Sequence, residues 1–146
     1  MSEIVMRPTL WRSCRVLANE RRLRLLKSVL VMGPLSVSEA AGKNKLPLSI
    51  TSTYLRQLNA RGFLRVSRQG SNVYYTVGSD PLVQHAEILL ASICDAIQAC
   101  SKACEFHRVI YALTTCTCPR RIKLVRNIAK TPDMDCETLR RETGMS

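Results

Sequence analysis

The sequence predicts a mainly α-helical protein with one small β-hairpin, followed by a long helix and a shortened copy of its first helices. Three observations indicate this fold class. Apolar residues recur at helical spacing through most of the 146 residues. Residues 63–77 instead alternate apolar and polar side chains on either side of a Gly-containing turn. A segment near the C-terminus repeats one near the N-terminus.

Two helices are expected between Leu10 and Met32, in TLWRSCRVLA and ERRLRLLKSVLVM, with Asn19 placed to cap the second. Gly33-Pro34 then ends that helix, because Gly suits a helix C-cap and Pro cannot continue the helix. Ser36 or Ser38 can cap a short third helix around VSEAAGKNK.

A fourth helix is expected in LPLSITSTYLRQLNARG, where Gly62 ends it. Its apolar face is formed by Ile50 or Thr51 together with Leu55 and Leu58. The polar side chains of Ser49, Ser52, Thr53, Arg56 and Asn59 fall on its other faces.

The next segment, FLRVSRQGSNVYYTV, has two β-prone runs separated by residues 69–72. Val73, Tyr75 and Val77 occupy alternate positions of the second run, which is typical of a hairpin strand. Helix, helix, short helix, helix and hairpin is the order of a winged helix-turn-helix, with a two-stranded β-wing. The sequence therefore places such a domain at residues 1–78, with its elements at about 10–78.

The charge of the chain indicates a polyanionic partner. Lys and Arg outnumber Asp and Glu by 22 to 11, which gives a net charge of +11. Of these, 13 basic and only 4 acidic residues lie in the first 80 positions. A basic, clustered surface beside a winged helix favours double-stranded DNA as the partner.

No N-terminal signal segment and no membrane-spanning stretch are evident, so we expect a cytoplasmic protein without membrane contact. Seven cysteines without a secretory signal predict reduced thiols rather than a disulfide framework. No Gly-rich phosphate loop or nucleophile with an orienting group is evident, and we expect neither an enzyme nor a bound cofactor.

Residues 79–107 are expected to form a long helix, begun by Ser79-Asp80-Pro81. Apolar residues and cysteines follow one stripe at a spacing of three or four, as in a coiled-coil seam: Val83, Ala86, Leu90, Ile93, Ile97, Cys100 and Cys104. Such a stripe needs a partner. A second copy of the chain, giving a homodimer, is the favoured partner, and packing on the chain's own winged domain is the alternative.

Residues 108–146 are expected to form a partial second winged-helix-like segment. NERRLRLLKSVLVMGPLSVSEA, from Asn19, matches CPRRIKLVRNIAKTPDMDCETL, from Cys118, with a single-residue gap. Pro34 aligns with Pro132 and Glu39 with Glu137. The second copy stops before a recognition helix and wing, so part of its apolar face should remain uncovered. Chance similarity between helices is the alternative.

The segment from Leu17 to Val77 resembles the arsenic-repressor-like (ArsR-like) winged-helix transcription factors. The resemblance rests on LANERRLRLLKSV, GPLSVSEAA, SITSTYLRQLNARGFL and the wing VSRQGSNVYYTV, and covers about 60 residues. It implies that the helix SITSTYLRQL enters the DNA major groove. Four side chains are then candidate groove contacts: Ser49, Ser52, Thr53 and Arg56. Three side chains of the wing are candidate contacts to the DNA backbone: Arg65, Arg68 and Gln69.

The metal sites of that family do not transfer to this chain. VSEAAGKNK lacks the family's paired cysteines, and only His85 and Glu87 match its acid and histidine cluster. Cys100 and Cys104 remain as weak thiolate candidates, but free cysteines on an apolar seam are more often small buried hydrophobes. We therefore expect no metal site.

The sequence as a whole predicts a DNA-binding homodimer that regulates transcription, by repression rather than activation. A winged helix used as a protein-interaction module is one alternative. A metal-sensing or redox-sensing regulator that uses its C-terminal cysteines is another.

Overall fold

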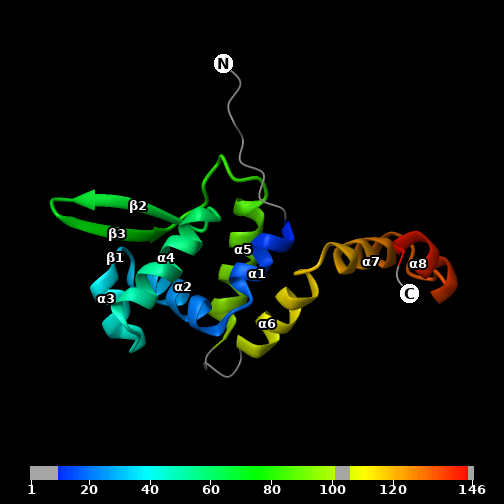
Figure 1. The fold of residues 1–146 in the computed structure, drawn as a ribbon, viewed down its shortest axis with the longest axis horizontal. Helices are drawn as coiled ribbons and strands as arrows, with labels where there is room; N and C mark the ends of the chain where they lie inside the picture. The colour runs from blue at the N-terminus through cyan, green and yellow to red at the C-terminus, as the bar shows by residue number, and fades with distance from the viewer. Residues whose placement is uncertain (1–9, 101–105, 145–146) are drawn as a thin grey trace, which may run out of the picture.

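A computed structural model describes residues 10–100 and 106–144 (Figure 1). The elements of the N-terminal part are α1 (Leu10–Leu17), α2 (Glu20–Met32), β1 (Leu35–Ser36), α3 (Val37–Asn44), α4 (Leu48–Ala60), β2 (Leu64–Gln69) and β3 (Asn72–Val77). The C-terminal part adds α5 (Ala86–Ala99), α6 (Phe106–Thr115), α7 (Pro119–Lys130) and α8 (Cys136–Thr143). This order confirms the predicted mainly α-helical fold with a winged helix-turn-helix.

The predicted helix ends of α2 and α3 are confirmed by their caps. The Asn19 side chain accepts a hydrogen bond from the backbone N–H of Arg22 at 3.1 Å. Gly33 ends α2 with a φ of 84°, which favours glycine. Ser36, rather than Ser38, caps α3 through a capping box with Glu39, in which each side chain accepts the other residue's backbone N–H.

The hairpin is confirmed, and a third strand joins it. β2 and β3 pair antiparallel from Leu64 opposite Val77 to Gln69 opposite Asn72. The two-residue strand β1 pairs with β3 on the other side, and Leu35 lies opposite Tyr75. The sequence predicts only two strands, because two residues are too short to show the alternation of a strand.

The core lies between α1, α2, α4, α5, α6 and the inner face of the sheet. Its fully buried side chains include Phe63, Leu17, Leu23, Leu26 and Leu55. Their burial removes apolar surface from water, which supplies the main driving force for the fold. Within residues 10–100 and 106–144, no helix is long and apolar enough to cross a membrane.

The long helix expected at residues 79–107 is wrong in its bounds. Asp80 does cap a turn, since its side chain accepts the N–H of Leu82 at 2.9 Å. The turn does not continue as a helix, because His85 has a φ of 66° and α5 starts at Ala86. α5 ends at Ala99, because the backbone of its C-cap residue Cys100 is extended, and α6 starts at Phe106.

The seam expected to hold a second subunit is covered by the same chain. All its described members are buried within the protomer: Val83, Ala86, Leu90, Ile93, Ile97 and Cys100. They lie against α2 and α6, so the alternative of packing on the chain's own domain applies. Cys104 lies outside the described residues. A homodimer therefore needs another surface.

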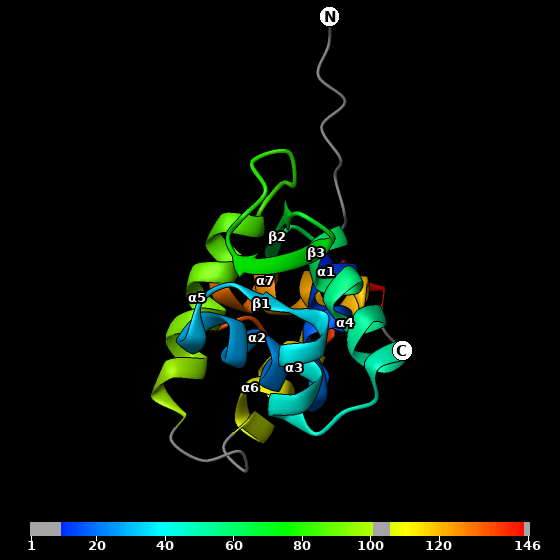
Figure 2. The ribbon, with the colours of Figure 1, turned by 90° about the vertical axis from the view of Figure 1, so that its left-hand side faces the viewer.

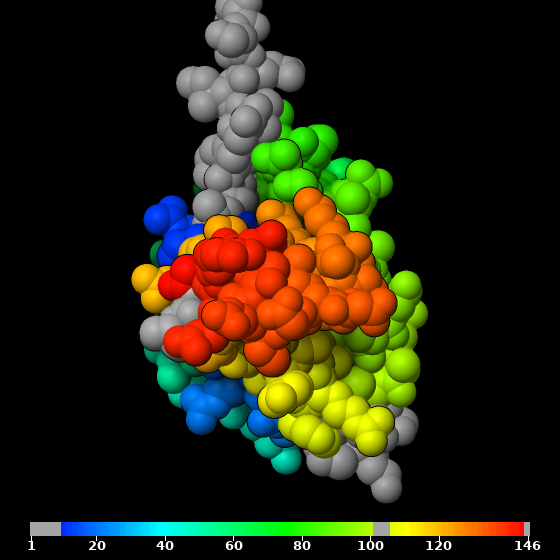
Figure 3. All heavy atoms as spheres, turned by 90° about the vertical axis from the view of Figure 1, so that its right-hand side faces the viewer, coloured from blue at the N-terminus to red at the C-terminus, as the bar shows by residue number. Residues whose placement is uncertain are grey.

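The repeat at Cys118 folds as a second helix pair. α7 and α8 correspond to α2 and α3, and Cys118 occupies the N-cap position of α7 as Asn19 does in α2. These two helices pack mainly on each other and project from one end of the molecule (Figure 1), the end that faces the viewer in Figure 3. Val125 and Ile128 remain 46% and 43% exposed, as expected of an incomplete apolar face.

The sequence predicts that the partial second winged-helix-like segment starts at residue 108, which lies within α6. The structure instead packs α6 into the core of the winged domain. Phe106 and Leu113 are 2% and 6% exposed and share the main cluster with α1 and α5. Their burial makes α6 an integral part of the first domain. We therefore propose that the partial second winged-helix unit begins near Cys118.

Candidate nucleic-acid interface

The four candidate residues of α4 form one polar stripe. Ser49, Thr53 and Arg56 are exposed and Ser52 is half-buried, on the side of the helix away from Thr51, Leu55 and Leu58. The packing of those three side chains in the core therefore fixes which side of α4 faces outward. The Thr53 hydroxyl donates to the Ser49 carbonyl at 3.0 Å, and Arg56 Nε donates to the Ser52 carbonyl at 3.3 Å. These local bonds leave the guanidinium Nη atoms of Arg56 available to a partner.

The three wing residues are divided between the two faces of the hairpin. The strand register puts Arg65 and Gln69 on one face, together with Tyr74, and Arg68 on the face that Tyr75 shares. Arg68 and Gln69 are exposed next to the turn. Arg65 donates to the Ser79 carbonyl from Nε and Nη2 at 3.1 and 2.8 Å, which holds it at the base of the hairpin.

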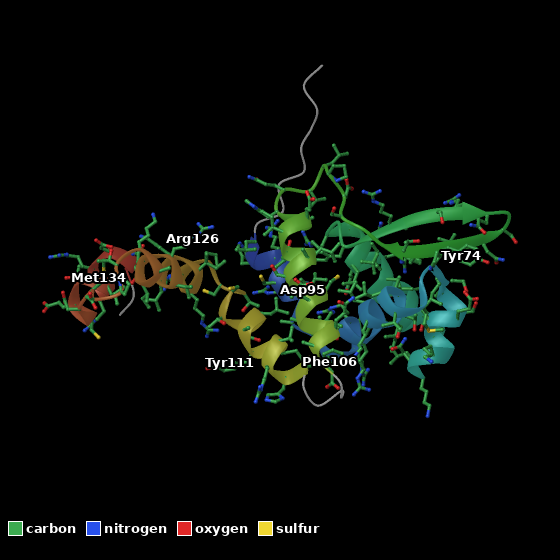
Figure 4. The ribbon with its side chains drawn as sticks, turned by 180° about the vertical axis from the view of Figure 1, so that it is seen from behind. Tyr74, Asp95, Phe106, Tyr111, Arg126 and Met134 are labelled. Carbon is green, nitrogen blue, oxygen red and sulfur yellow. The ribbon has the colours of Figure 1, made fainter. Side chains whose placement is uncertain are left out.

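α4 and the hairpin lie at the same end of the molecule. Figure 2 shows the hairpin above α3 with α4 beside it, and Figure 4 shows Tyr74 on the projecting hairpin. The Asn59 side chain near the end of α4 donates to the Leu64 carbonyl at 2.7 Å, which ties the helix directly to β2. The two sets of candidate residues are thus held in one rigid arrangement.

The side chain of Arg22 on α2 contacts Tyr54 and Gln57 of α4 and so holds this helix against the domain. The Arg22 guanidinium lies over the Tyr54 ring, 5.3 Å from its centroid, and donates to the Gln57 side chain at 3.2 Å. It also donates to the carbonyls of Val16 and Arg15. Burial lowers the pKa of this guanidinium, and the Tyr54 hydroxyl opposes that effect. The Tyr54 ring therefore packs against the side chain of Arg22.

A cationic cluster that was not predicted from the sequence lies beside the N-terminus of α4. Arg21, Arg24 and Lys45 line a depression of about 450 Å³, together with Pro47 and Ile50. Arg24 is in part neutralised by an ion pair with Glu20 on the same helix. The excess of basic residues signals such a cluster, but its position depends on α2 lying against the turn between α3 and α4.

The cysteines in the described part of the chain differ in their surroundings, which shift their thiol pKa values in opposite directions. Burial raises the pKa of the Cys14 thiol to about 11, and the neighbouring thiol of Cys116 adds to the shift. At the start of α7, the backbone N–H groups of Arg121 and Arg120 lower the pKa of Cys118. Cys100 is buried, and its expected partner Cys104 is outside the described residues.

The residues that the structure describes do not form a group of three or more His, Cys, Asp or Glu side chains able to hold a metal ion. His85 and Glu87 are both exposed near the start of α5. The surface described above is therefore built from hydroxyl, amide and guanidinium groups, which bind phosphate oxygens and base edges.

Comparison with known proteins gives the following similarities. The chain is 32% identical over 84 residues to the transcriptional activator HlyU of Vibrio cholerae, which covers 58% of this chain and 77% of that protein. The structure of reduced HlyU from Vibrio cholerae is 27% identical, with a TM-score of 0.49, and covers 60% of this chain and 84% of that one.

Two further solved structures are similar. One is the homodimeric winged helix-turn-helix DNA-binding domain of Mb0332 from Mycobacterium bovis, a possible ArsR-family regulator. It is 24% identical, with a TM-score of 0.49, and covers 62% of this chain and 80% of that one. The antimony-specific repressor AntR is 33% identical, with a TM-score of 0.42, and covers 57% and 76%. No family model matches the chain.

Proposed function

This chain belongs to the ArsR-like family of winged-helix transcriptional regulators, and we propose that it binds double-stranded DNA in a sequence-specific way through α4 and the β2–β3 hairpin. Its 32% identity to HlyU, over 77% of that regulator, carries the family assignment. The relatives described above are regulators rather than enzymes. We place the protein in the cytoplasm, where such regulators meet DNA.

The observation that carries the binding mode is the polar stripe of α4. Three of its members are exposed, and the major groove of DNA is wide enough to admit one such helix. Arg56 is the strongest candidate for base contact, because a guanidinium can donate two hydrogen bonds to a guanine edge. Arg68 and Gln69 at the wing tip would contact the adjacent backbone.

We further propose that the protein acts as a homodimer on a roughly palindromic site, with two α4 helices about one turn of DNA apart. The outer side of α5 supplies a surface for this contact. Ile88 is 72% exposed there, and Leu82 in the preceding turn is 47% exposed. We propose that these two side chains form the apolar part of the contact between the subunits, because contact would remove their exposed surface from water.

We propose that the protein represses transcription by occluding the promoter, because repression of this kind requires only that the protein bind DNA. HlyU is named as an activator and AntR as a repressor, so both signs occur among proteins similar to this chain. A reporter gene with the selected site inside its promoter distinguishes the two. Repression predicts lower reporter expression when the protein is present, and higher expression would overturn it.

The binding proposal is tested by fluorescence anisotropy against a selected duplex and random duplexes. We expect the selected duplex to bind at least about a thousandfold more tightly than random DNA, with affinity that falls steeply with salt. Arg56→Ala should weaken specific binding by about tenfold or more and affect random DNA less, because one bidentate base contact contributes roughly 1–3 kcal/mol.

Arg140→Ala is the matched control, because it removes an exposed cation of α8 at the other end of the molecule. Its affinity for the selected duplex should stay within about twofold of the wild type. Equal loss in both variants would indicate a general effect of charge rather than a contact by α4. Uniformly weak binding to all duplexes would favour a protein-interaction module instead.

A further inference from the structure

A groove of about 500 Å³ lies between α7, the start of α1 and the turn before α5. Residues of three segments line it, and those used below are Leu10, Trp11, Ile122, Lys123, Arg126 and Lys130. Its size falls within the roughly 300–1,000 Å³ of small-molecule sites. Figure 3 shows the molecule from the end at which α7 and α8 project, with these two helices in front.

The α7 side of the groove is cationic. Lys123, Arg126 and Lys130 follow one face of the helix, and no carboxylate side chain belongs to the lining. Among the residues that the structure describes, none of these three cations forms an ion pair or a side-chain hydrogen bond. Arg126 and Lys130 are four positions apart and repel each other on the same helix. A bound anion would relieve that repulsion.

The α1 part of the lining is an apolar wall formed by Leu10 and Trp11. Ile122 adds apolar surface from α7, and Gln84 and His85 of the turn before α5 add polar groups. The guanidinium groups of Arg12 and Arg15 lie 5.2 and 5.0 Å from the Trp11 ring centroid and add positive charge near this wall. An inorganic anion would leave the apolar wall in contact with water, and a neutral apolar ligand would leave the cations without a partner.

The groove is separate from the surface proposed to bind DNA. α7 and the hairpin project from opposite ends of the molecule (Figure 1). Figure 4 shows the same separation at the level of side chains, with Arg126 on α7 and Tyr74 on the hairpin. The cations of α7 are therefore placed for a ligand other than the DNA held by α4.

We propose that this groove binds a small organic anion that has a carboxylate or sulfonate head and an apolar body. The head lies among Lys123, Arg126 and Lys130, and the body lies against Leu10, Trp11 and Ile122. The site does not depend on the proposed binding of DNA.

Tryptophan fluorescence of the full chain tests this site directly, because Trp11 is the only tryptophan. The probe is octanoate, and 1-octanol is the neutral control of the same length. Octanoate should change the Trp11 emission in a saturable way, and 1-octanol should bind at least tenfold more weakly. Equal binding of the two compounds, or no saturable change with octanoate up to several millimolar, overturns the proposal.

The cations are tested with the double variant Lys123→Gln/Arg126→Gln. The matched control is Arg140→Gln/Arg141→Gln, which removes the same charge from exposed positions of α8 that do not line the groove. Octanoate affinity, measured by calorimetry as well as fluorescence, should fall at least tenfold in the first variant and stay within twofold in the second. An equal loss in both, with unchanged far-ultraviolet circular dichroism, shows a diffuse charge effect and overturns the site.

Discussion

At the scale of single residues, the side chain of Arg22 on α2 links α1 to α4. Its guanidinium donates hydrogen bonds to two carbonyls at the end of α1 and to the side chain of Gln57 on α4. It also lies over the ring of Tyr54. The carbonyls at the end of a helix otherwise lack partners, so this side chain satisfies α1 and positions α4 at once.

Arg22→Ala should therefore lower the free energy of unfolding by about 2 kcal/mol, because it removes several hydrogen bonds from a charged donor and the packing on Tyr54. The measurement is urea unfolding with an unchanged m-value. Arg21→Ala is the control, since Arg21 is exposed on the same helix, and its effect should stay within about 0.5 kcal/mol. Equal effects of the two substitutions would contradict the role of Arg22.

Cys118 and Cys14 are expected to differ in their reaction with iodoacetamide. The pKa of Cys118 is lowered by the backbone N–H groups of Arg121 and Arg120, so its reactive thiolate forms at a lower pH than that of an ordinary thiol. The pKa of Cys14 is raised to about 11 by burial, so it stays protonated until strongly alkaline pH. Peptide mass spectrometry between pH 6 and 9 should show Cys118 labelled at least about tenfold faster than Cys14.

Unfolding the protein in urea supplies the control for that comparison, because both thiols then lose their surroundings. Their labelling rates should become similar. Labelling of Cys14 as fast as Cys118 in the folded protein would contradict the burial of Cys14 where α1 packs against α6.

At the scale of elements, Gly62 lies in the turn between α4 and β2 and packs against the segment that begins α5. Its φ is 73°, and a Cβ atom there would lie 2.9 Å from Val83 Cβ and 3.2 Å from Ala86 Cβ. The glycine therefore allows both the turn into β2 and the close approach of the segment that begins α5.

Gly62→Ala should cost at least about 2 kcal/mol of unfolding free energy, since it adds a clash to the strain of a positive φ. Gly70→Ala is the matched control, because Gly70 has a φ of 61° with no atom within 4 Å of the added Cβ. It should cost only about 1 kcal/mol, from backbone strain alone. Urea unfolding of the two variants measures this difference. Equal losses of unfolding free energy would show that a side chain at position 62 does not clash with Val83.

The comparison of α4 with α5 shows which elements the sequence can predict. The starts of α2 and α3 follow from capping side chains and the ends of α2 and α4 from nearby glycines, and the structure agrees. The start of α5 does not, because residues 81–85 are held by tertiary contact between Val83 and Gly62. The stripe of α5 is recognisable from its spacing, but spacing alone cannot decide whether α2 and α6 or a second chain covers it.

The candidate site shows the same division. The outward stripe of α4 is predictable, because helical periodicity fixes it relative to the buried Leu55 and Leu58. The separation of Arg65 from Arg68 also follows from strand alternation, once the register is known. The cluster of Arg21, Arg24 and Lys45 is not predictable in this way, since it brings together α2 and the turn after α3.

At the scale of the whole molecule, the chain consists of a winged-helix body with α6 packed into it and an appended helix pair. Leu113 of α6 is 6% exposed in the shared core, whereas α7 has no buried side chain. The body therefore gains most of its stability without α7 and α8.

Removal of residues 118–146 should consequently change the free energy of unfolding of the body by less than about 1 kcal/mol. Removal of residues 106–146 should cost at least about 3 kcal/mol, because it also exposes the core positions filled by Phe106 and Leu113, and each large apolar side chain contributes roughly 1.5–3 kcal/mol when buried. Urea unfolding of both shortened chains, followed by circular dichroism, measures the two losses. A large loss in the first shortened chain would show that α7 and α8 stabilise the winged domain.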